Sequence, residues 1–190
     1  MKRILIYGDS NVWGDNFSGL RIPYHLRWTN RLKRSLKNDY EIIANGVCGR
    51  IAGNYRSNKP ECNGQSSFYQ IYGKVGHVDV VMVALGTNDF QERFSRTADD
   101  IINDLLWYKN AVGETEIIYI LPPNFSADKD SGPEFTLKSQ KIRNQIMCNK
   151  EKLGNYIIVD NIELSDGIHF SSQGHKSMAK IVGEEIKAGL

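Results

Sequence analysis

The sequence contains few cysteines, few prolines and no long hydrophobic run. The three cysteines, Cys48, Cys62 and Cys148, are odd in number and form no C-x-x-C pair, which argues against a disulfide framework and against a zinc site. No segment approaches the roughly 18 apolar residues that a membrane span needs. With 17 glycines and 5 prolines, the chain is not of the low-complexity or collagen-like class. These absences indicate a globular protein, and the cysteine content fits a reducing cytoplasm.

An excess of charge of one sign is also missing. The 24 Lys and Arg residues are nearly balanced by 22 Asp and Glu residues, and a net charge of +2 does not indicate nucleic acid as the main partner. The apolar run after Lys2 and Arg3 ends at Tyr7, which is too short for a secretory signal. We therefore expect one domain over residues 1–190, located in the cytoplasm, with no membrane partner. Its oligomeric state is open, a homo-oligomer included.

Short apolar runs alternate with segments of helical spacing along the whole chain. The runs are nearly continuous and rich in β-branched residues, which is typical of strands buried on both faces of a parallel sheet. We predict five such strands, at residues 3–7, 40–44, 78–85, 116–121 and 156–159, and helices at 24–36, 97–112, 133–153 and 171–188. Thr97 and Asp100 have the spacing of a helix-capping pair. The alternation predicts an α/β sandwich with a mainly parallel sheet, and two irregular stretches, 52–67 and 122–135, interrupt it.

Polar, glycine-containing clusters follow four of the predicted strands. They are Gly8-Asp9-Ser10-Asn11, Asn45-Gly46-Val47-Cys48-Gly49-Arg50, Gly86-Thr87-Asn88-Asp89 and Asp166-Gly167-Ile168-His169. In an open parallel sheet the carboxyl ends of the strands lie on one edge, where ligands bind. The four clusters are therefore expected to converge at a single site.

The residue types in these clusters suit acyl transfer. Ser10 is the candidate nucleophile, and His169 is the base that would take its proton. Asp166, three residues before His169, can hold the imidazole by its Nδ1 atom, which completes a Ser-His-Asp arrangement. The N–H groups of Ser10 and Gly49 and the side-chain amide of Asn88 are candidate donors to an oxyanion, each worth about 3 kcal/mol of barrier.

The four clusters, in this order, resemble the sequence blocks of the SGNH (GDSL-type) hydrolases, a family of esterases and lipases. The resemblance implies a flavodoxin-like three-layer α/β/α sandwich with a five-stranded parallel sheet. It also implies Ser10 as nucleophile, Gly49 and Asn88 as oxyanion donors, and Asp166 and His169 as acid and base. Asn11 stands where the family name has leucine, and Gly46 is an alternative to Gly49. Three segments, Gly8–Gly14, Arg27-Trp28 and Asp166–Phe170, are similar to those of small arylesterase and acetylesterase members.

Simpler roles compete for several of these residues. Ser10 could cap a helix, and Asp166 could serve only as a turn residue before Gly167. Asp9 and Asp89 are expected to be structural, and Arg50 either to touch substrate or to be solvated. The remaining histidines are expected at the surface or the core edge; they are His25, His77 and His175. Most of the aromatic residues that flank the clusters are expected in the core; these residues are Trp13, Phe17, Phe90, Phe94 and Phe170.

The residues together predict a serine esterase that acts on a small-molecule ester with a short, acetyl-type acyl group, and that needs no cofactor and no metal. A carbohydrate O-deacetylase and a thioesterase are alternatives of the same class. A flavodoxin-like module that binds a small ligand without turnover is the alternative that is not an enzyme.

Overall fold

The computed structural model describes residues 1–16, 20–125 and 132–189. Its main sheet has five parallel strands, as predicted. From one edge to the other these are β4 (Tyr40–Gly46), β1 (Lys2–Gly8), β5 (Val80–Ala84), β6 (Glu116–Ile120) and β7 (Tyr156–Ile157). The first strand lies between the second and the third along the chain, which is the flavodoxin-like order. The chain therefore changes direction across the sheet beside β1, and the carboxyl ends of β4, β1 and β5 share one edge.

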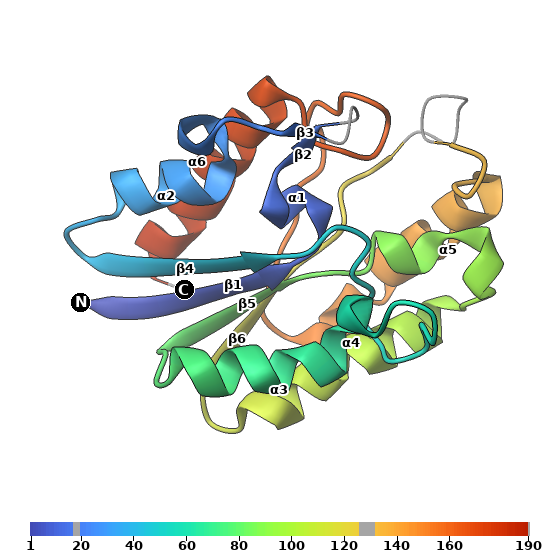
Figure 1. The fold of residues 1–190 in the computed structure, drawn as a ribbon, viewed down its shortest axis with the longest axis horizontal. Coiled ribbons are helices and arrows are strands. Elements are labelled where there is room, and N and C mark those ends of the chain that lie inside the picture. Colours follow the sequence, from blue (N-terminus) through green and yellow to red (C-terminus); the bar gives the residue numbers. More distant parts are fainter. Residues whose placement is uncertain (17–19, 126–131, 190) are drawn as a thin grey trace.

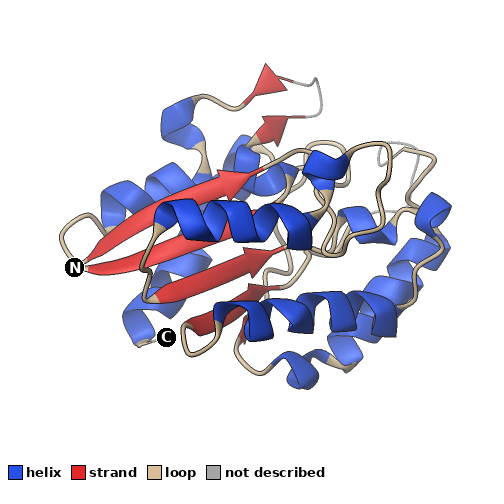
Figure 2. Ribbon diagram, turned by 60° about the horizontal axis from the view of Figure 1, so that its bottom comes forward, coloured by secondary structure: helices blue, strands red, loops and turns tan. Residues whose placement is uncertain are grey.

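Helices cover both faces of this sheet, which gives the three layers of the sandwich (Figure 1, Figure 2). One face carries α1 (Ser10–Trp13), α2 (Trp28–Ser35) and α6 (Ser172–Ala188). The other face carries α3 (Gly64–Val75), α4 (Ala98–Val112) and α5 (Leu137–Cys148). Among the helices of the described residues, none combines the length and the apolar character that a membrane crossing requires.

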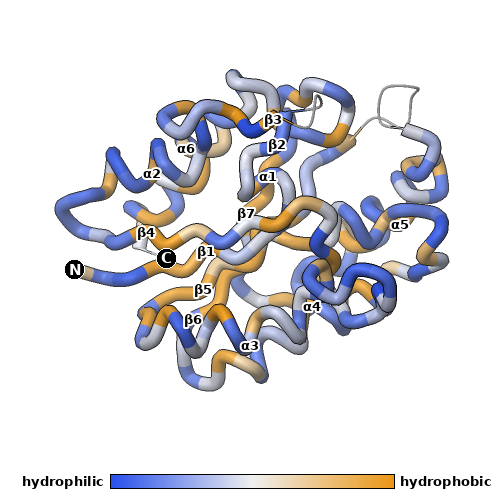
Figure 3. Tube along the Cα trace, viewed as in Figure 1, coloured by the Kyte–Doolittle hydropathy of each residue, from blue (hydrophilic) through white to orange (hydrophobic). Residues whose placement is uncertain are grey.

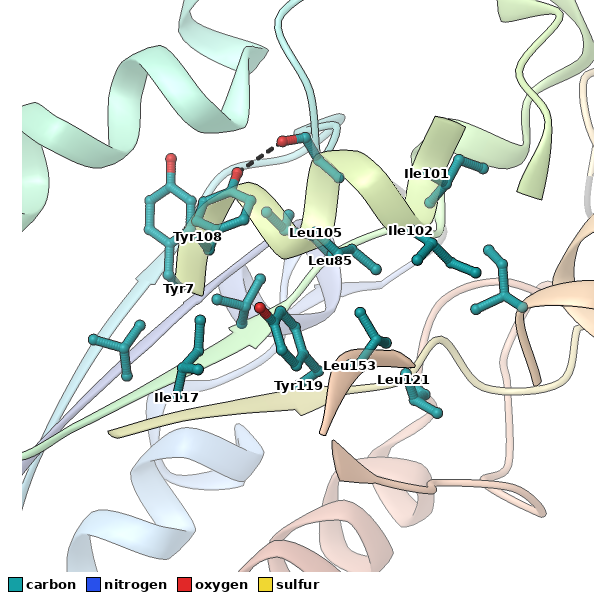
Figure 4. Close-up of a cluster of buried hydrophobic side chains, with 14 of the residues drawn as sticks. Tyr7, Leu85, Ile101, Ile102, Leu105, Tyr108, Ile117, Tyr119, Leu121 and Leu153 are labelled. Atoms are coloured by element: carbon teal, nitrogen blue, oxygen red, sulfur yellow. Dashed lines mark hydrogen bonds between the residues drawn. The ribbon is translucent and has the colours of Figure 1, made fainter. Parts of the chain in front are cut away.

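Two hydrophobic clusters hold the layers together, and the hydropathy of the trace is highest along the strands (Figure 3). Alternate side chains of each strand point to opposite faces, so Leu5 packs with α3 and α4 while Ile4 and Ile6 pack with α2 and α6. In the larger cluster the buried Tyr108 hydroxyl donates to the Ala52 carbonyl oxygen at 2.8 Å (Figure 4). This bond ties the stretch after β4 to α4.

The predicted helices are present, with adjusted limits. Thr97 caps α4 and forms a capping box with Asp100, as its spacing predicts. The predicted helix at 24–36 begins as a short 3-10 turn, Tyr24–Leu26, before α2. The predicted helix at 133–153 is divided into α5 and a 3-10 turn, Lys150–Leu153.

The sequence prediction missed α3 and a hairpin. The stretch 52–67 is irregular only to residue 63, because α3 begins at Gly64. Ser66, Ser67 and Gly73 lower the helix propensity of this segment. Phe68 is the one large side chain that α3 buries completely, so the segment has little apolar periodicity. The strands β2 (Asp15–Asn16) and β3 (Leu20–Arg21) are antiparallel and have two residues each, which is too short for a periodic signal. Part of the second irregular stretch, 126–131, lies outside the described residues.

Candidate active site

Ser10 lies directly after β1 as the first residue of α1. The helix is capped by Asp9, whose carboxylate accepts a hydrogen bond from the Asn11 N–H at 2.9 Å. Asp9 is therefore structural, as expected, and the alternative role of Ser10 as the N-cap is wrong. Within the described residues, neither the Ser10 N–H nor its hydroxyl has a hydrogen-bond partner. Both groups are thus available to a ligand, although the side chain is only 5% exposed.

His169 and Asp166 form a hydrogen-bonded pair inside a tight turn. The turn is closed by the Ser165 N–H, which donates to the His169 carbonyl oxygen at 2.8 Å, and Gly167 supplies its positive φ of 82°. One oxygen of Asp166 accepts from the N–H groups of Ile168 and His169, at 3.0 and 2.7 Å. The other lies 2.6 Å from His169 Nδ1. Asp166 therefore both shapes the turn and orients the imidazole. Because Nδ1 is bonded to Asp166, Nε2 is the ring nitrogen that can accept a proton.

Asn11 joins the Ser10 turn to the His169 turn, which are remote in sequence. Its side-chain oxygen accepts from the Phe170 N–H at 2.9 Å, and its side-chain nitrogen donates to the Ile168 carbonyl oxygen at 3.2 Å. Both partners are direct neighbours of His169. One buried amide side chain thus fixes the backbone on each side of His169 next to the residue that follows Ser10. Sequence reasoning noted Asn11 only as a departure from leucine and missed this role.

The turn after β4 and the turn after β5 contribute the predicted amide donors. Gly49 has a φ of 76°, and its N–H finds no acceptor among the described residues. Its carbonyl oxygen is held by Arg56 Nη1 at 2.6 Å. The Asn88 side chain donates to the Arg50 carbonyl oxygen at 3.1 Å and accepts from Gln91 at 3.1 Å. These bonds fix the Asn88 amide and leave its second N–H available.

The structure separates the roles of the two candidate glycines. A Cβ atom at Gly46 would lie 2.2 Å from the Trp13 nitrogen, so Gly46 lets α1 pack directly on the end of β4. Gly49 instead has the positive φ that turns its backbone. Gly46 is therefore a packing residue, and Gly49 is the better candidate for an oxyanion donor.

Arg50 is 1% exposed, so the expectation that it is solvated is wrong. Its guanidinium donates to the Gly8 carbonyl oxygen at 2.8 Å and to the Asn45 carbonyl and side-chain oxygens at 3.0 and 2.8 Å. It also lies over the Tyr7 ring, 4.1 Å from its centroid. Arg50 therefore ties the end of β1 to the turn that carries Gly49.

His169 faces a second carboxylate that sequence reasoning missed. Asp15 of β2 places one oxygen 3.8 Å from His169 Nε2, and its other oxygen is buried with no hydrogen-bond partner among the described residues. Burial alone would lower the pKa of His169, but the hydrogen bond and charge of Asp166, together with Asp15 and Asp9, raise it above the ordinary value. Burial also raises the pKa of Asp9, to about 6. The imidazole thus lies in a negative field.

Cys48 lies next to this group. Its thiol donates to Asp15 at 3.5 Å, and burial together with the Asp15 charge raises the pKa of Cys48 to about 12. The residue is therefore a neutral thiol and not a nucleophile at neutral pH. No spacing in the sequence pairs Asp15 with Cys48 or His169, because the three come together only through the tertiary fold.

Other predicted residues are structural. Asp89 accepts from the Ala52 N–H at 2.9 Å and the Tyr55 hydroxyl at 2.7 Å, and burial raises its pKa to about 6. His175 is fully buried, not at the core edge, and its Nδ1 accepts from the Trp28 N–H at 3.3 Å. His25 and His77 are exposed.

The flanking aromatic residues are divided between the core and half-buried positions. Phe90 and Phe170 are in the core, Trp13 and Phe94 are half-buried, and Phe17 lies outside the described residues. All three cysteines are free thiols. The described residues contain no group of three or more His, Cys, Asp or Glu side chains arranged to hold a metal ion.

Comparison with solved structures identifies the fold. No family model and no curated protein sequence matches the chain. A carbohydrate acetylesterase family member from Sinorhizobium meliloti superposes with a TM-score of 0.87 at 20% identity, over 99% of this chain and 98% of that one. An aryl esterase from M. smegmatis gives 0.83 at 24% identity over the whole of both chains. A lipase/acylhydrolase from Enterococcus faecalis gives 0.73 at 20% identity, over 99% and 96%. The chain therefore has an SGNH-hydrolase-like fold over its full length.

Proposed function

We propose that this protein is a serine esterase that hydrolyses carboxylic esters with short acyl groups. One observation carries the proposal: the Asn11 side chain bonds on both sides of His169, which brings the Ser10 turn to the His169–Asp166 pair. The fold shared with esterases supports it, because those proteins have the same architecture over their whole length. The N–H groups of Ser10 and Gly49, which have no acceptor among the described residues, are a further support.

In the proposed acylation step, Ser10 Oγ attacks the ester carbonyl carbon while His169 Nε2 accepts the hydroxyl proton. Asp166, bonded to Nδ1, stabilises the imidazolium that forms. The carbonyl oxygen becomes an oxyanion that accepts from the Ser10 and Gly49 N–H groups and the Asn88 amide. Collapse of this intermediate breaks the ester C–O bond, and the alcohol leaves with the proton from Nε2. Before substrate binds, the Ser10 hydroxyl is not bonded to His169, and catalytic hydrogen bonds commonly tighten only in the substrate complex.

Deacylation repeats the chemistry with water as the nucleophile. His169 takes a proton from water, the hydroxide adds to the acyl carbon, and the proton returns to Ser10 Oγ as the carboxylic acid leaves. Asp15 lies on the Nε2 side of the ring, so it adds to the stabilisation of the imidazolium in both steps. The donors and the base need no metal or cofactor for this sequence.

The names of two structural neighbours favour a particular alcohol. Two of the similar structures are carbohydrate acetylesterases from Sinorhizobium meliloti, the second superposing with a TM-score of 0.84. Removal of acetyl groups from a carbohydrate is therefore the second candidate function. It uses the same residues and differs only in the alcohol that leaves.

Two variants test the proposed function with p-nitrophenyl acetate. Ser10→Ala and His169→Ala should each lower kcat by at least about 1,000-fold, while near-UV circular dichroism remains native. A fluorophosphonate probe should label the wild type at Ser10 and should not label the Ser10→Ala variant. Undiminished turnover in either variant would refute the mechanism. An acyl series from acetyl to decanoyl should show falling kcat/KM, and rising values would refute the short-acyl preference.

A further inference from the structure

A groove of about 420 Å³ lies beside the proposed active site, along the free edge of the sheet. Its floor is formed by the residues of β4 from Ile42 to Ala44, with Gly46 and Val12 at one end. Three cationic side chains line its walls: Arg21, Arg27 and Lys33. The described lining residues include no aspartate and no glutamate. In a chain whose charges nearly balance, this groove is a local concentration of positive charge.

The three cations have no carboxylate partner within the described residues, although ten ion pairs are found elsewhere, among them Arg143 with Asp160. The neutral polar residues of the wall, Tyr24, Thr29 and Asn30, add hydrogen-bonding groups without neutralising the charge. A surface groove with this lining attracts anions.

The two arginines are held in position by their inner nitrogens. Arg21 Nε donates to the Trp13 carbonyl oxygen at 2.7 Å, and its guanidinium lies 4.7 Å from the centroid of the Trp13 ring. Arg27 Nε donates to the Ile22 carbonyl oxygen at 2.8 Å. The stem of Arg27 passes over Gly14, where a Cβ atom would lie only 3.0 Å away. Among the described residues, the terminal nitrogens of both guanidinium groups have no hydrogen-bond partner, so they can bind a planar or tetrahedral anion in a bidentate manner.

The arginines are close enough to repel each other. Burial and the positive charge of Arg21 both lower the pKa of Arg27. Two like charges repel each other, and an anion bound between them would offset this repulsion.

The groove shares two elements, α1 and β4, with the proposed catalytic residues or the turns that carry them. Val12 is in the same helix as Ser10, and Gly46 precedes the turn that carries Gly49. Arg21 lies opposite Asp15 in the backbone register of the β2–β3 ladder, without an ion pair between their side chains, and an oxygen of Asp15 lies 3.8 Å from His169 Nε2. The field of Arg21 also reaches Cys48, whose pKa it lowers against the stronger effects of burial and Asp15. The alcohol part of an ester at Ser10 would enter the groove if it reached across α1 toward β4.

We propose that this groove binds an anionic group carried by the substrate, so that the preferred substrates are acyl esters of anionic alcohols. The negative group would be a carboxylate, sulfate or phosphate. It belongs to the alcohol, because a short acyl group has no atoms left to carry it. This inference rests on the proposed function for the orientation of the ester, whereas the binding of the anion stands independently of turnover.

Matched esters that differ by one charge test the proposal. para-Acetoxybenzoate is compared with para-acetoxybenzamide, and para-acetoxyphenylbutanoate with its amide, so that two distances from the ester are sampled. We expect kcat/KM to favour the acid over the amide by about tenfold for at least one pair. High sodium chloride should reduce this preference.

Two double variants locate the effect. In Arg21→Gln/Arg27→Gln the acid-to-amide ratio should fall to about one. In Lys74→Gln/Lys141→Gln, which removes the same charge from exposed positions on α3 and α5 across the sheet, the ratio should stay at its wild-type value. Equal rates for acid and amide at both distances, or a preference that survives the arginine variant, would overturn the proposal.

Binding without turnover separates this inference from the proposed function. Calorimetric titration with para-hydroxybenzoate and para-hydroxybenzamide measures affinity for the product alone. Tighter binding of the acid than of the amide, lost in the arginine variant, supports the anion-binding groove even if no ester is hydrolysed. The absence of hydrolysis would contradict only the esterase proposal. Equal affinity of the acid and the amide would overturn the groove, whatever the esterase assays show.

Discussion

Replacement of Asn11 by alanine should damage both the stability of the protein and the position of its proposed base. The side chain makes two hydrogen bonds to backbone groups on either side of His169, at 2.9 and 3.2 Å. Alanine keeps the helix α1 but removes both bonds. It leaves the Phe170 N–H and the Ile168 carbonyl group buried without partners, since these two residues are 3% and 5% exposed.

The magnitude follows from those two groups. A buried polar group that loses its partner costs about 1–3 kcal/mol, so the two groups together should cost about 2–6 kcal/mol in free energy of unfolding. A domain in the middle of the ordinary range of about 5–15 kcal/mol remains folded after such a loss. The His169 turn would then be free to move relative to Ser10, and a displacement of about 1 Å between reacting groups can lower a rate about 100-fold. We expect kcat for p-nitrophenyl acetate to fall by about that factor with little change in KM.

Urea denaturation at pH 7 and steady-state kinetics measure the two effects separately. The control is Ile186→Ala, because Ile186 is 2% exposed in α6 and lies beside Tyr40 at the start of β4, away from the proposed site. It should lose a similar stability, about 3 kcal/mol, and keep its kcat. A normal kcat in Asn11→Ala despite the loss of stability would refute the argument that this side chain positions the base. An unchanged stability would refute the energetic reasoning.

Three further predictions concern pH and packing. His169, the proposed base, must be neutral to act, and its pKa is raised above 6.5, so kcat/KM should fall on acidification with a midpoint above pH 6.5. Asp166→Asn should move that midpoint down, and an unmoved midpoint would contradict the pairing of Asp166 with His169. Burial lowers the pKa of His175 to about 4, so the unfolded chain takes up this proton at a higher pH than the folded chain. The free energy of unfolding should therefore fall by about 3 kcal/mol between pH 6.5 and 4, and urea titrations of His175→Gln should lack this fall. Gly46→Ala should lower the free energy of unfolding by about 3 kcal/mol, because the added Cβ pushes α1 away from β4. Gly73→Ala is the control: its Cβ meets nothing within 4 Å, so chemical denaturation should show unchanged or higher stability.

Features that depend on short stretches of sequence could be predicted from the residues. The five strands are continuous apolar runs, and their order of alternation with helices allows only a parallel sheet with covered faces. Thr97 and Asp100 cap α4 because the capping box needs only a spacing of three residues. The pairing of Asp166 with His169 has the same origin, since one turn of chain brings the two side chains together.

The fold alone decided the features that join distant segments. The bonds of Asn11 to Ile168 and Phe170 cross about the whole length of the chain, and nothing local in the sequence announces them. Arg50 is charged, and an arginine is ordinarily expected to be exposed to water. In the fold, carbonyl oxygens at the ends of two strands and an aromatic ring take the place of water around its guanidinium. Asp15 meets His169 only because a two-residue strand places it there.

The sequence by itself therefore determined the layers of the sandwich and the candidates for the reactive side chains, because these depend on hydrophobic period and on the chemistry of single residues. Only the tertiary structure decided how the reactive groups are held and what charge surrounds them. The physical reason is that hydrogen bonds and electrostatic fields act between neighbours in space, and His169, near the end of the chain, has Asn11 and Asp15 from its beginning as neighbours.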